Sequence, residues 1–263
     1  MTQLFRNDAL TGRRALVTGA SRGIGAAIAS RFASLGAEVV LAADDAPGLE
    51  DTKNAIIAAG GSATTEVVDL TDQEAIADLA GRHDDVDTLV NNAAPAQQPF
   101  PLLDAPDELW DKMFALNFWA PLRLIKAIVP SMIKAGGGCV INISSISARN
   151  PAPRVAPYAS SKAALEIVTR VAAMELGPNG IRINSIAPSM VRTQRTQAML
   201  DDPAFAASAV ARVPMGRLAE TEDVAGAAAW LASDAASFVT GQVLAIEGGS
   251  SVGTYSHVPP KAR

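Results

Sequence analysis

The sequence predicts one α/β domain built on a doubly wound, parallel β-sheet of about seven strands, with helices on both faces. Short apolar runs alternate with longer helical patterns along the 263 residues, and this alternation is typical of parallel β-α-β units. Hydrophobic residues make up 49% of the chain and charged residues 19%, which permits a large packed core. No Pro- or Ser-rich linker divides the sequence, so residues 1–263 are expected to form a single domain.

In the first half of the chain, each apolar run is followed by a helical pattern. Strands are expected at 15–18, 38–42, 63–68 and 88–90, and helices at 24–35, 49–59, 73–80 and 107–134. Pro121 lies inside the last helical stretch and should kink or interrupt it, because proline has no backbone N–H to donate.

The second half repeats the alternation around one irregular stretch. Strands are expected at 140–143, 182–186 and 243–246, and helices at 158–176 and 222–232. Residues 190–218 form an unusually long connection, which predicts a lid over a substrate site or a disordered segment. A surface helical insertion without a role is the alternative.

Composition argues against several classes of partner. The chain has 22 Lys and Arg against 27 Asp and Glu, a net charge of −5, whereas nucleic-acid binding needs clustered basic residues. No apolar run reaches the length of a membrane span, and residues 1–14 are too polar for a signal peptide. We therefore expect a cytoplasmic protein that binds neither nucleic acid nor membrane.

The cysteine and histidine content predicts no metal site. The one cysteine, Cys139, lies in an apolar run and should be a buried thiol. His83 and His257 are too few and too isolated to form a zinc site. Because two aspartates follow His83, its side chain is expected in a solvated loop.

A glycine-rich turn separates the first expected strand from the first expected helix. It reads Thr18-Gly19-Ala20-Ser21-Arg22-Gly23-Ile24-Gly25. Glycines allow a tight turn and close approach of the backbone to a pyrophosphate, and the helix N-terminus adds N–H groups and a positive dipole end. An ordinary turn is the alternative, but the position between strand and helix is the one that dinucleotide binding requires.

The spacing Gly-x-x-x-Gly-x-Gly resembles the short-chain dehydrogenase/reductase family, and the resemblance extends over about residues 10–249. Three further blocks carry it: Asn91-Asn92-Ala93-Ala94, Tyr158-Ala159-Ser160-Ser161-Lys162 and Asn184-Ser185-Ile186-Ala187-Pro188. Ala94 and Ser189 depart from the family pattern, which commonly has glycine at both places. The resemblance implies a Rossmann-type fold and an NAD(P)-dependent oxidoreductase that transfers a hydride between a nicotinamide and a carbonyl or secondary alcohol.

The expected reacting centre begins with Tyr158 and Lys162, which lie four residues apart and so share one face of a helix. A nearby ammonium lowers a phenol pKa from its ordinary value of about 10. A pair that merely faces solvent is the alternative. The resemblance implies that Tyr158 is the general acid/base, that Lys162 also holds the nicotinamide ribose, and that Asn117 positions a relay water. It also implies a serine on the substrate oxygen. Ser144 and Ser145 compete for that place, and the family spacing to Tyr158 favours Ser145.

The remaining site residues follow the carboxyl ends of the expected strands. The resemblance implies a cofactor site made by Gly19, Ser21, Arg22, Gly23, Ile24, Gly25, Asp44, Asp69, Leu70, Asn91, Ala93, Tyr158, Lys162, Pro188, Val191 and Thr193. An acid at the end of the second strand binds the adenosine ribose and repels a 2′-phosphate. Ala43 takes the usual place of that acid, yet Asp44 follows it, while Arg22 favours a phosphate. The sequence predicts NAD over NADP.

Substrate and partners are less closely specified. Four arginines, Arg149, Arg154, Arg192 and Arg195, are expected near the pocket and could bind a carboxylate or phosphate; a solvated rim is the alternative. The family implies a homo-oligomer, a dimer or tetramer. An apolar face on the helix 158–176, formed by Ala163, Ile167, Val171 and Met174, fits such a contact or the core. A non-catalytic NAD(P)-sensing protein, and a lyase or epimerase using bound nicotinamide, are the alternative functions.

Overall fold

The computed structural model of the chain describes residues 8–96 and 98–253. It holds one seven-stranded sheet in the order β3-β2-β1-β4-β5-β6-β7, and every pairing is parallel. The strands are β1 (Arg14–Thr18), β2 (Glu38–Ala43), β3 (Ser62–Val67), β4 (Thr88–Asn91), β5 (Gly138–Ile143), β6 (Ile181–Pro188) and β7 (Val243–Ile246). Strands β2 and β3 are added on one side of β1, and β4 to β7 on the other. The strand order therefore reverses between β1 and β4, and the predicted doubly wound sheet is confirmed.

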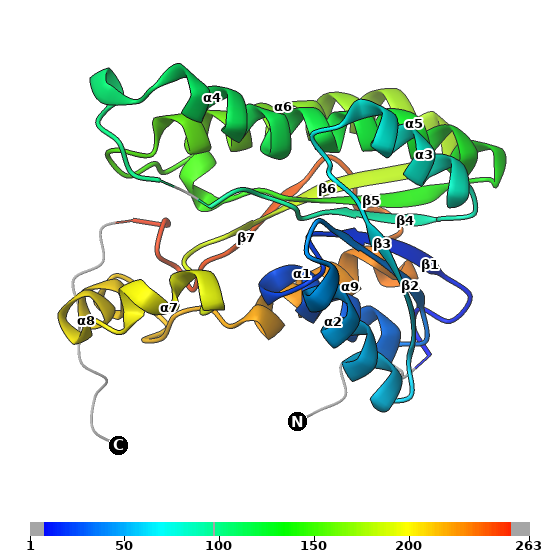
Figure 1. Ribbon diagram of the computed structural model, residues 1–263, viewed down its shortest axis with the longest axis horizontal. Coiled ribbons are helices and arrows are strands. Elements are labelled where there is room, and N and C mark those ends of the chain that lie inside the picture. Colours follow the sequence, from blue (N-terminus) through cyan, green and yellow to red (C-terminus); the bar gives the residue numbers. More distant parts are fainter. Residues whose placement is uncertain (1–7, 97, 254–263) are drawn as a thin grey trace.

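Helices cover both faces of this sheet (Figure 1). One layer contains α1 (Gly23–Ser34), α2 (Ala46–Ala58) and α9 (Thr221–Ala232). The other contains α3 (Gln73–Arg82), α4 (Asp107–Phe114), α5 (Ala120–Lys134) and α6 (Ala156–Leu176). Side chains of β1 alternate between the two cores: Val17 packs into the cluster under α1 and α9, and Leu16 into the cluster under α3 and α5. Burial of both faces explains why these strands are continuous apolar runs in the sequence.

The predicted helix at 107–134 is interrupted, as Pro121 indicated, but by a different element. A π-helical turn, Ala115–Trp119, separates α4 from α5. Pro121 lies in the first turn of α5, where a missing N–H removes no helical hydrogen bond. The turn carries Asn117, and π-helical turns often occur at functional sites.

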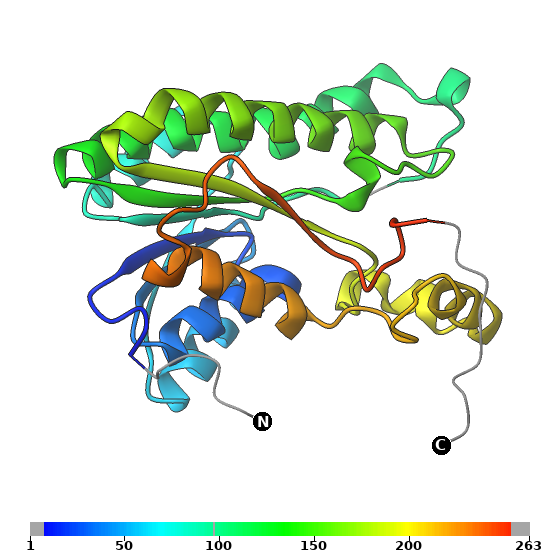
Figure 2. The ribbon, with the colours of Figure 1, turned by 180° about the vertical axis from the view of Figure 1, so that it is seen from behind.

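The long connection at 190–218 is helical. It contains α7 (Gln194–Leu200) and α8 (Pro203–Ala211), which enclose a small core of Leu200, Ala209, Val213 and Leu218. Figure 2 shows this pair projecting beyond the sheet as a separate lobe. The ordered lobe argues against the disordered alternative.

Two expectations about single residues have opposite outcomes. Cys139 is buried, as expected. The expectation for His83 was wrong: its ring is buried, with Nε2 2.7 Å from Oε1 of Glu66, because β3 presents that carboxylate to the end of α3. His257 lies outside the described residues, as do 1–7, 97 and the rest of 254–263. None of the described helices combines the length and the apolar character needed to cross a bilayer.

Candidate active site

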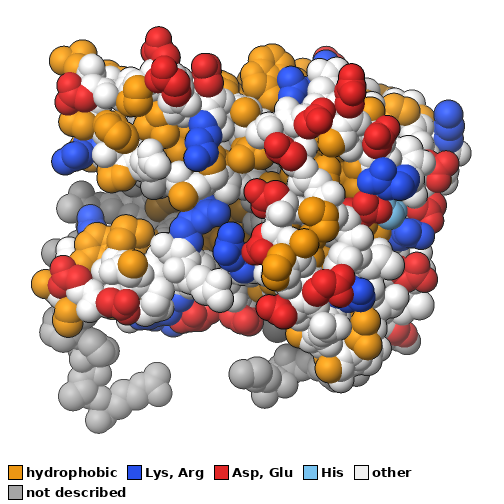
Figure 3. Space-filling view, in the orientation of Figure 1, with side chains coloured by type: hydrophobic (Ala, Val, Ile, Leu, Met, Phe, Trp, Pro, Cys, Tyr) orange, Lys and Arg blue, Asp and Glu red, His pale blue; other side chains and the backbone are white. Residues whose placement is uncertain are grey.

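A cleft of about 1210 Å³ opens at the carboxyl ends of the central strands, between the sheet and the α7–α8 lobe. Figure 3 shows the molecule hollowed beside this lobe, with basic side chains along the hollow. The predicted site residues that line it are Gly19, Ser21, Arg22, Gly23, Ile24, Asp44, Asp69, Leu70, Ala93, Ser145, Tyr158, Lys162, Pro188, Val191 and Thr193. Parallel sheets bind ligands at such a point, where the strand order reverses.

The glycine turn lies at one end of the cleft. Gly19 and Gly23 have φ angles of 63° and 59°, a backbone region that side chains disfavour. A Cβ on Gly25 would collide with the carbonyl oxygen of Gly19. Arg22, the N-cap of α1, makes no side-chain capping bond, and the first turn of α1 holds no acidic residue. The backbone N–H groups at the start of α1 therefore remain suited to binding a phosphate, and the glycine turn fits a dinucleotide.

The structure separates two neighbouring asparagines of the sequence motif. Asn91 does not line the cleft; its amide nitrogen donates to Oδ1 of Asn142 on β5 at 2.8 Å. Asn92, which the sequence analysis did not select, lines the cleft and donates to the carbonyl oxygens of Thr18 and Gly19 at 2.9 and 3.1 Å. Asn92 thus holds the glycine turn in shape. Its position next to Asn91 in the sequence motif is the feature from which this role could have been predicted.

Two predicted cofactor residues also have structural bonds. The carboxylate of Asp69 accepts from the backbone and hydroxyl of Thr71 at 2.8 and 2.7 Å, and these bonds lower the pKa of Asp69. Thr193 forms a capping box with Thr196 at the start of α7. Both residues still line the cleft.

Ser145, Tyr158 and Lys162 meet at the other end of the cleft. The hydroxyl of Ser145 lies close enough to the phenol of Tyr158 to influence its pKa. Lys162 is 2% exposed, and its Nζ donates to the carbonyl oxygen of Ile143 at 2.7 Å. Burial, together with a smaller effect of the nearby charge of Arg195, lowers the pKa of Lys162 to about 7. Burial raises the pKa of Tyr158, while Ser145 and Arg195 oppose that rise.

The two candidate serines point to different partners. Ser145 lies beside the phenol of Tyr158, whereas the hydroxyl of Ser144 donates to Oε1 of Glu166 at 2.9 Å. Glu166 is buried and also accepts from Nε of Arg149 at 3.0 Å. Glu166 therefore holds the segment on either side of Ser145 against α6.

Asn117 lies behind the reacting group, in the π-helical turn. Its amide nitrogen donates to Oγ of Ser161 at 3.0 Å, and that hydroxyl donates to the backbone oxygen of Tyr158 at 2.8 Å. Among the described residues, Oδ1 of the fully buried Asn117 has no hydrogen-bond partner. A buried acceptor without a protein partner is a place where an ordered water binds.

The four arginines expected near the pocket differ in where the structure places them. Arg149 pairs with Glu166, Arg192 pairs with Glu220 at 3.3 Å, and the exposed Arg154 lies off the cleft wall. Only Arg195 of the four lines the cleft. Lys112 and Arg212 also line it, and no motif singled them out.

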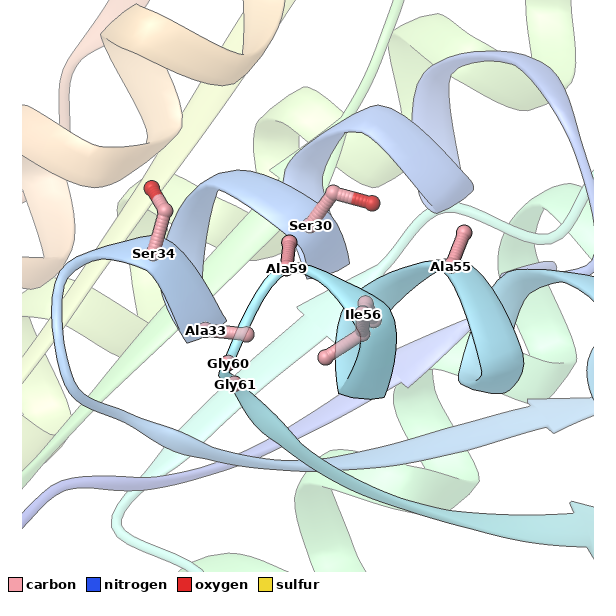
Figure 4. Close-up of a pocket in the computed structure, with 8 residues that line it drawn as sticks. All are labelled: Ser30, Ala33, Ser34, Ala55, Ile56, Ala59, Gly60 and Gly61. Atoms are coloured by element: carbon pink, nitrogen blue, oxygen red, sulfur yellow. The ribbon is translucent and has the colours of Figure 1, made fainter.

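A second, smaller pocket carries no comparable chemistry. It measures about 130 Å³ between α1 and α2 and is lined by Ser30, Ala33, Ser34, Ala55, Ile56, Ala59, Gly60 and Gly61 (Figure 4). These side chains are small and hold no titratable group, so the large cleft is the candidate active site.

Comparison with known proteins agrees with this site. The family model described as enoyl-(acyl carrier protein) reductase matches residues 19–251. Gluconate 5-dehydrogenase of Gluconobacter oxydans (strain 621H) is 39% identical over 247 residues, which cover 92% of this chain and 96% of the relative. Dehydrogenase/reductase SDR family member 4 of Homo sapiens is 37% identical over 253 residues, covering 94% and 90%.

A solved structure is similar over nearly the whole fold. The crystal structure of gluconate 5-dehydrogenase from Burkholderia cenocepacia J2315, in complex with NADP and tartrate, has a TM-score of 0.89 and 31% identity, covering 94% of this chain and 98% of that one. The chain belongs to the short-chain dehydrogenase/reductase family. It is an NAD(P)-dependent oxidoreductase that transfers a hydride between a nicotinamide and a carbonyl or secondary alcohol. The predicted family, fold and activity are confirmed, and the comparisons do not support a sensing protein, lyase or epimerase.

Proposed function

We propose that this chain is an NAD-dependent dehydrogenase/reductase in which Tyr158 is the general acid/base. The observation that carries the proposal is that Ser145, Tyr158 and the buried side chain of Lys162 line the same end of a cleft that begins at the glycine turn. An acid/base group, a polarising donor and a nearby cation are the parts that carbonyl reduction requires.

The chain's own residues move and stabilise the proton. In reduction, Ser145 donates a hydrogen bond to the substrate oxygen, and Tyr158 transfers its phenolic proton to that oxygen; oxidation reverses both steps. Charged Lys162 favours the phenolate of Tyr158 and is placed to bind the nicotinamide ribose. Asn117 holds a water through its unpartnered oxygen, which links the site to solvent. The bound nicotinamide supplies or accepts the hydride.

Replacing Tyr158 with Phe tests this assignment. Turnover should fall by about 100-fold to 10,000-fold, the usual contribution of general acid–base catalysis, while NADH affinity stays within a few-fold of the wild type. Steady-state rates and NADH fluorescence measure the two effects. Ser145→Ala should reduce kcat far more than its neighbour Ser144→Ala, because Ser145 lies beside Tyr158 while the hydroxyl of Ser144 is bonded to Glu166. Turnover near the wild-type value in the Tyr158 variant contradicts the role.

The preference for NAD rests on charge at the adenosine end of the cleft. Asp44 lines the cleft with an exposed side chain. Arg22, the expected phosphate partner, lies 3.7 Å from the carboxylate of Asp45. A 2′-phosphate would meet the carboxylate of Asp44, whereas a 2′-hydroxyl can donate to it. The related Burkholderia enzyme was solved with NADP, which favours the other cofactor.

Titration with NADH and NADPH decides between them. We expect tighter NADH binding in the wild type and a weaker preference in Asp44→Ala, because removal of the carboxylate relieves repulsion of the 2′-phosphate. Cofactor fluorescence gives both affinities. Tighter NADPH binding in the wild type would show that Arg22 outweighs Asp44.

The remaining assignments concern substrate, lid and assembly. We propose a small hydroxy or keto compound as substrate, and the gluconate dehydrogenases among the relatives put polyols and sugar acids first for screening. Residues 190–218 are proposed as the lid, since Met190, Met199 and Arg212 of this segment line the cleft. The exposed side chains of Ile167, Val171 and Met174 on α6 are proposed as a homo-oligomer contact. The proposed location is the cytoplasm.

A further inference from the structure

Arg195, the second residue of α7, crosses from the lid to the opposite wall of the cleft. Its Nη2 donates to the carbonyl oxygen of Ala94 at 3.0 Å, and its Nη1 donates to that of Pro95 at 3.2 Å. Ala94 and Pro95 follow β4 and line the cleft. The guanidinium therefore lies across the cleft, where a ligand meets it.

The partners of Arg195 differ from those of three other arginines near the cleft. Arg22, Arg149 and Arg192 each pair with a carboxylate, respectively of Asp45, Glu166 and Glu220. Within 8–96 and 98–253, no carboxylate forms an ion pair with Arg195, whose hydrogen-bond acceptors are two neutral carbonyl oxygens. A guanidinium has five N–H donors and binds oxyanions through two parallel bonds, so Arg195 keeps the capacity for an anionic ligand.

Charge around Arg195 points to the same chemistry. Its charge opposes the burial-driven rise in the pKa of Tyr158 and adds to the lowering of the pKa of Lys162, while burial and, to a smaller extent, the charge of Arg22 lower the pKa of Arg195 itself. Arg195 thus lies between the reacting centre and the glycine turn. The base of the lid is close to that turn, since a Cβ on Gly23 would lie 3.6 Å from Cγ2 of Thr193. Arg195 and Lys162 form no ion pair within the described residues, and two cations so placed favour a bound anion.

We propose that Arg195 is the oxyanion-binding residue of the lid, contacting either the dinucleotide pyrophosphate or a carboxylate on the substrate. The two sources present the same chemistry, a delocalised negative charge on paired oxygens, to the same guanidinium. The inference rests on the proposed function, because it takes the cleft to be the site of cofactor and substrate.

Calorimetry with matched ligands separates the two sources. ADP-ribose contains the pyrophosphate and adenosine lacks it; tartrate carries carboxylates where threitol, of the same chain length, carries hydroxymethyl groups. In Arg195→Gln we expect a loss of about tenfold or more in affinity for one of the two anions, as for removal of a charge-assisted hydrogen bond. Adenosine and threitol should bind as they do to the wild type. Tartrate and threitol are titrated into the NADH-bound protein.

Arg192→Gln is the control, because it removes the same charge from the same segment at a residue paired with Glu220 outside the cleft. It should leave all four affinities unchanged. A loss confined to ADP-ribose identifies the pyrophosphate, and a loss confined to tartrate identifies the substrate carboxylate. The inference is overturned if the wild type and Arg195→Gln bind both anions with equal affinity. Tartrate that binds to neither protein counts as equal affinity. The proposed function still stands after that result. Failure of the wild type to bind NADH overturns both.

Discussion

Lys162 shows how a single buried residue serves the site at a cost to stability. Its side chain is almost fully enclosed, and burial holds its pKa at about 7, against an ordinary value of 10.5. Among the described residues, no carboxylate pairs with its ammonium, and its hydrogen bond goes to the neutral carbonyl oxygen of Ile143. Burying an unpaired charge destabilises a fold. Catalytic groups are often placed in such environments because their protonation must change near neutral pH.

This placement predicts how stability depends on pH. Between about pH 7 and pH 10.5 the unfolded lysine is protonated and the folded one is largely neutral, so unfolding takes up a proton and the free energy of unfolding rises with pH. The contribution reaches about 1.4 kcal/mol per pH unit and is absent in Lys162→Met. Denaturant unfolding at several pH values measures the difference between wild type and variant. Parallel curves across this window would contradict the prediction.

At the scale of elements, the glycine turn and α1 depend on one another for close packing. Gly25 lies in the first turn of α1, at a point where its backbone meets the carbonyl of Gly19. The absence of a side chain there is a steric requirement, and the uncapped N-terminus beside it is the anion site. The same approach of backbone to backbone sets both the fold of the turn and its proposed function.

Gly25→Ala should therefore lower both stability and NADH affinity, because the added methyl forces the turn away from its position. Gly226→Ala is the matched control. Gly226 lies inside α9, and a Cβ there meets no atom within 4 Å. That variant should be neutral or more stable by up to about 1 kcal/mol, since alanine favours helices. Thermal unfolding and NADH fluorescence report the two effects; equal behaviour of the two variants would refute the steric argument.

At the scale of the whole molecule, the outer face of α6 carries apolar side chains that the described chain leaves exposed. Met174 is 73% exposed, and Ile167 and Val171 are also open. These residues do not belong to the monomer core, which removes one of the two readings of this helix face. Since α6 also carries Tyr158 and Lys162, an oligomer contact on this face would stabilise the position of the helix that carries the reacting centre.

Met174→Glu should shift the protein toward smaller species, because a charge would be buried in an otherwise apolar contact. Sedimentation velocity over a range of concentrations measures the change. Leu103→Glu is the control, since Leu103 is also exposed but lies on the short helix Leu102–Asp104, away from α6. An unchanged mass distribution in Met174→Glu would exclude this face as the contact.

The sequence by itself determined the class of fold, the order of the elements and most of the cleft. Strands buried on both faces are continuous apolar runs, so β1, β4 and β5 could be located from the pattern of apolar residues alone. The glycine turn and the Tyr158–Lys162 pair are local patterns, whose function depends on residues close together in the chain. Because parallel strands all end at one edge, their order also predicts that these local patterns meet.

Only the tertiary structure decided which partners the polar side chains choose. Ser144 and Ser145 are adjacent in sequence, yet Ser144 bonds Glu166 while Ser145 lies beside Tyr158. Arg149 and Arg192 pair with carboxylates, while Arg195 faces the cleft. Which polar side chains pair depends on the distances between segments that are far apart in the chain. A local sequence pattern does not contain those distances. Hydrophobic periodicity specifies which face is buried, but a hydrogen bond or ion pair is specified by the position of both partners in space.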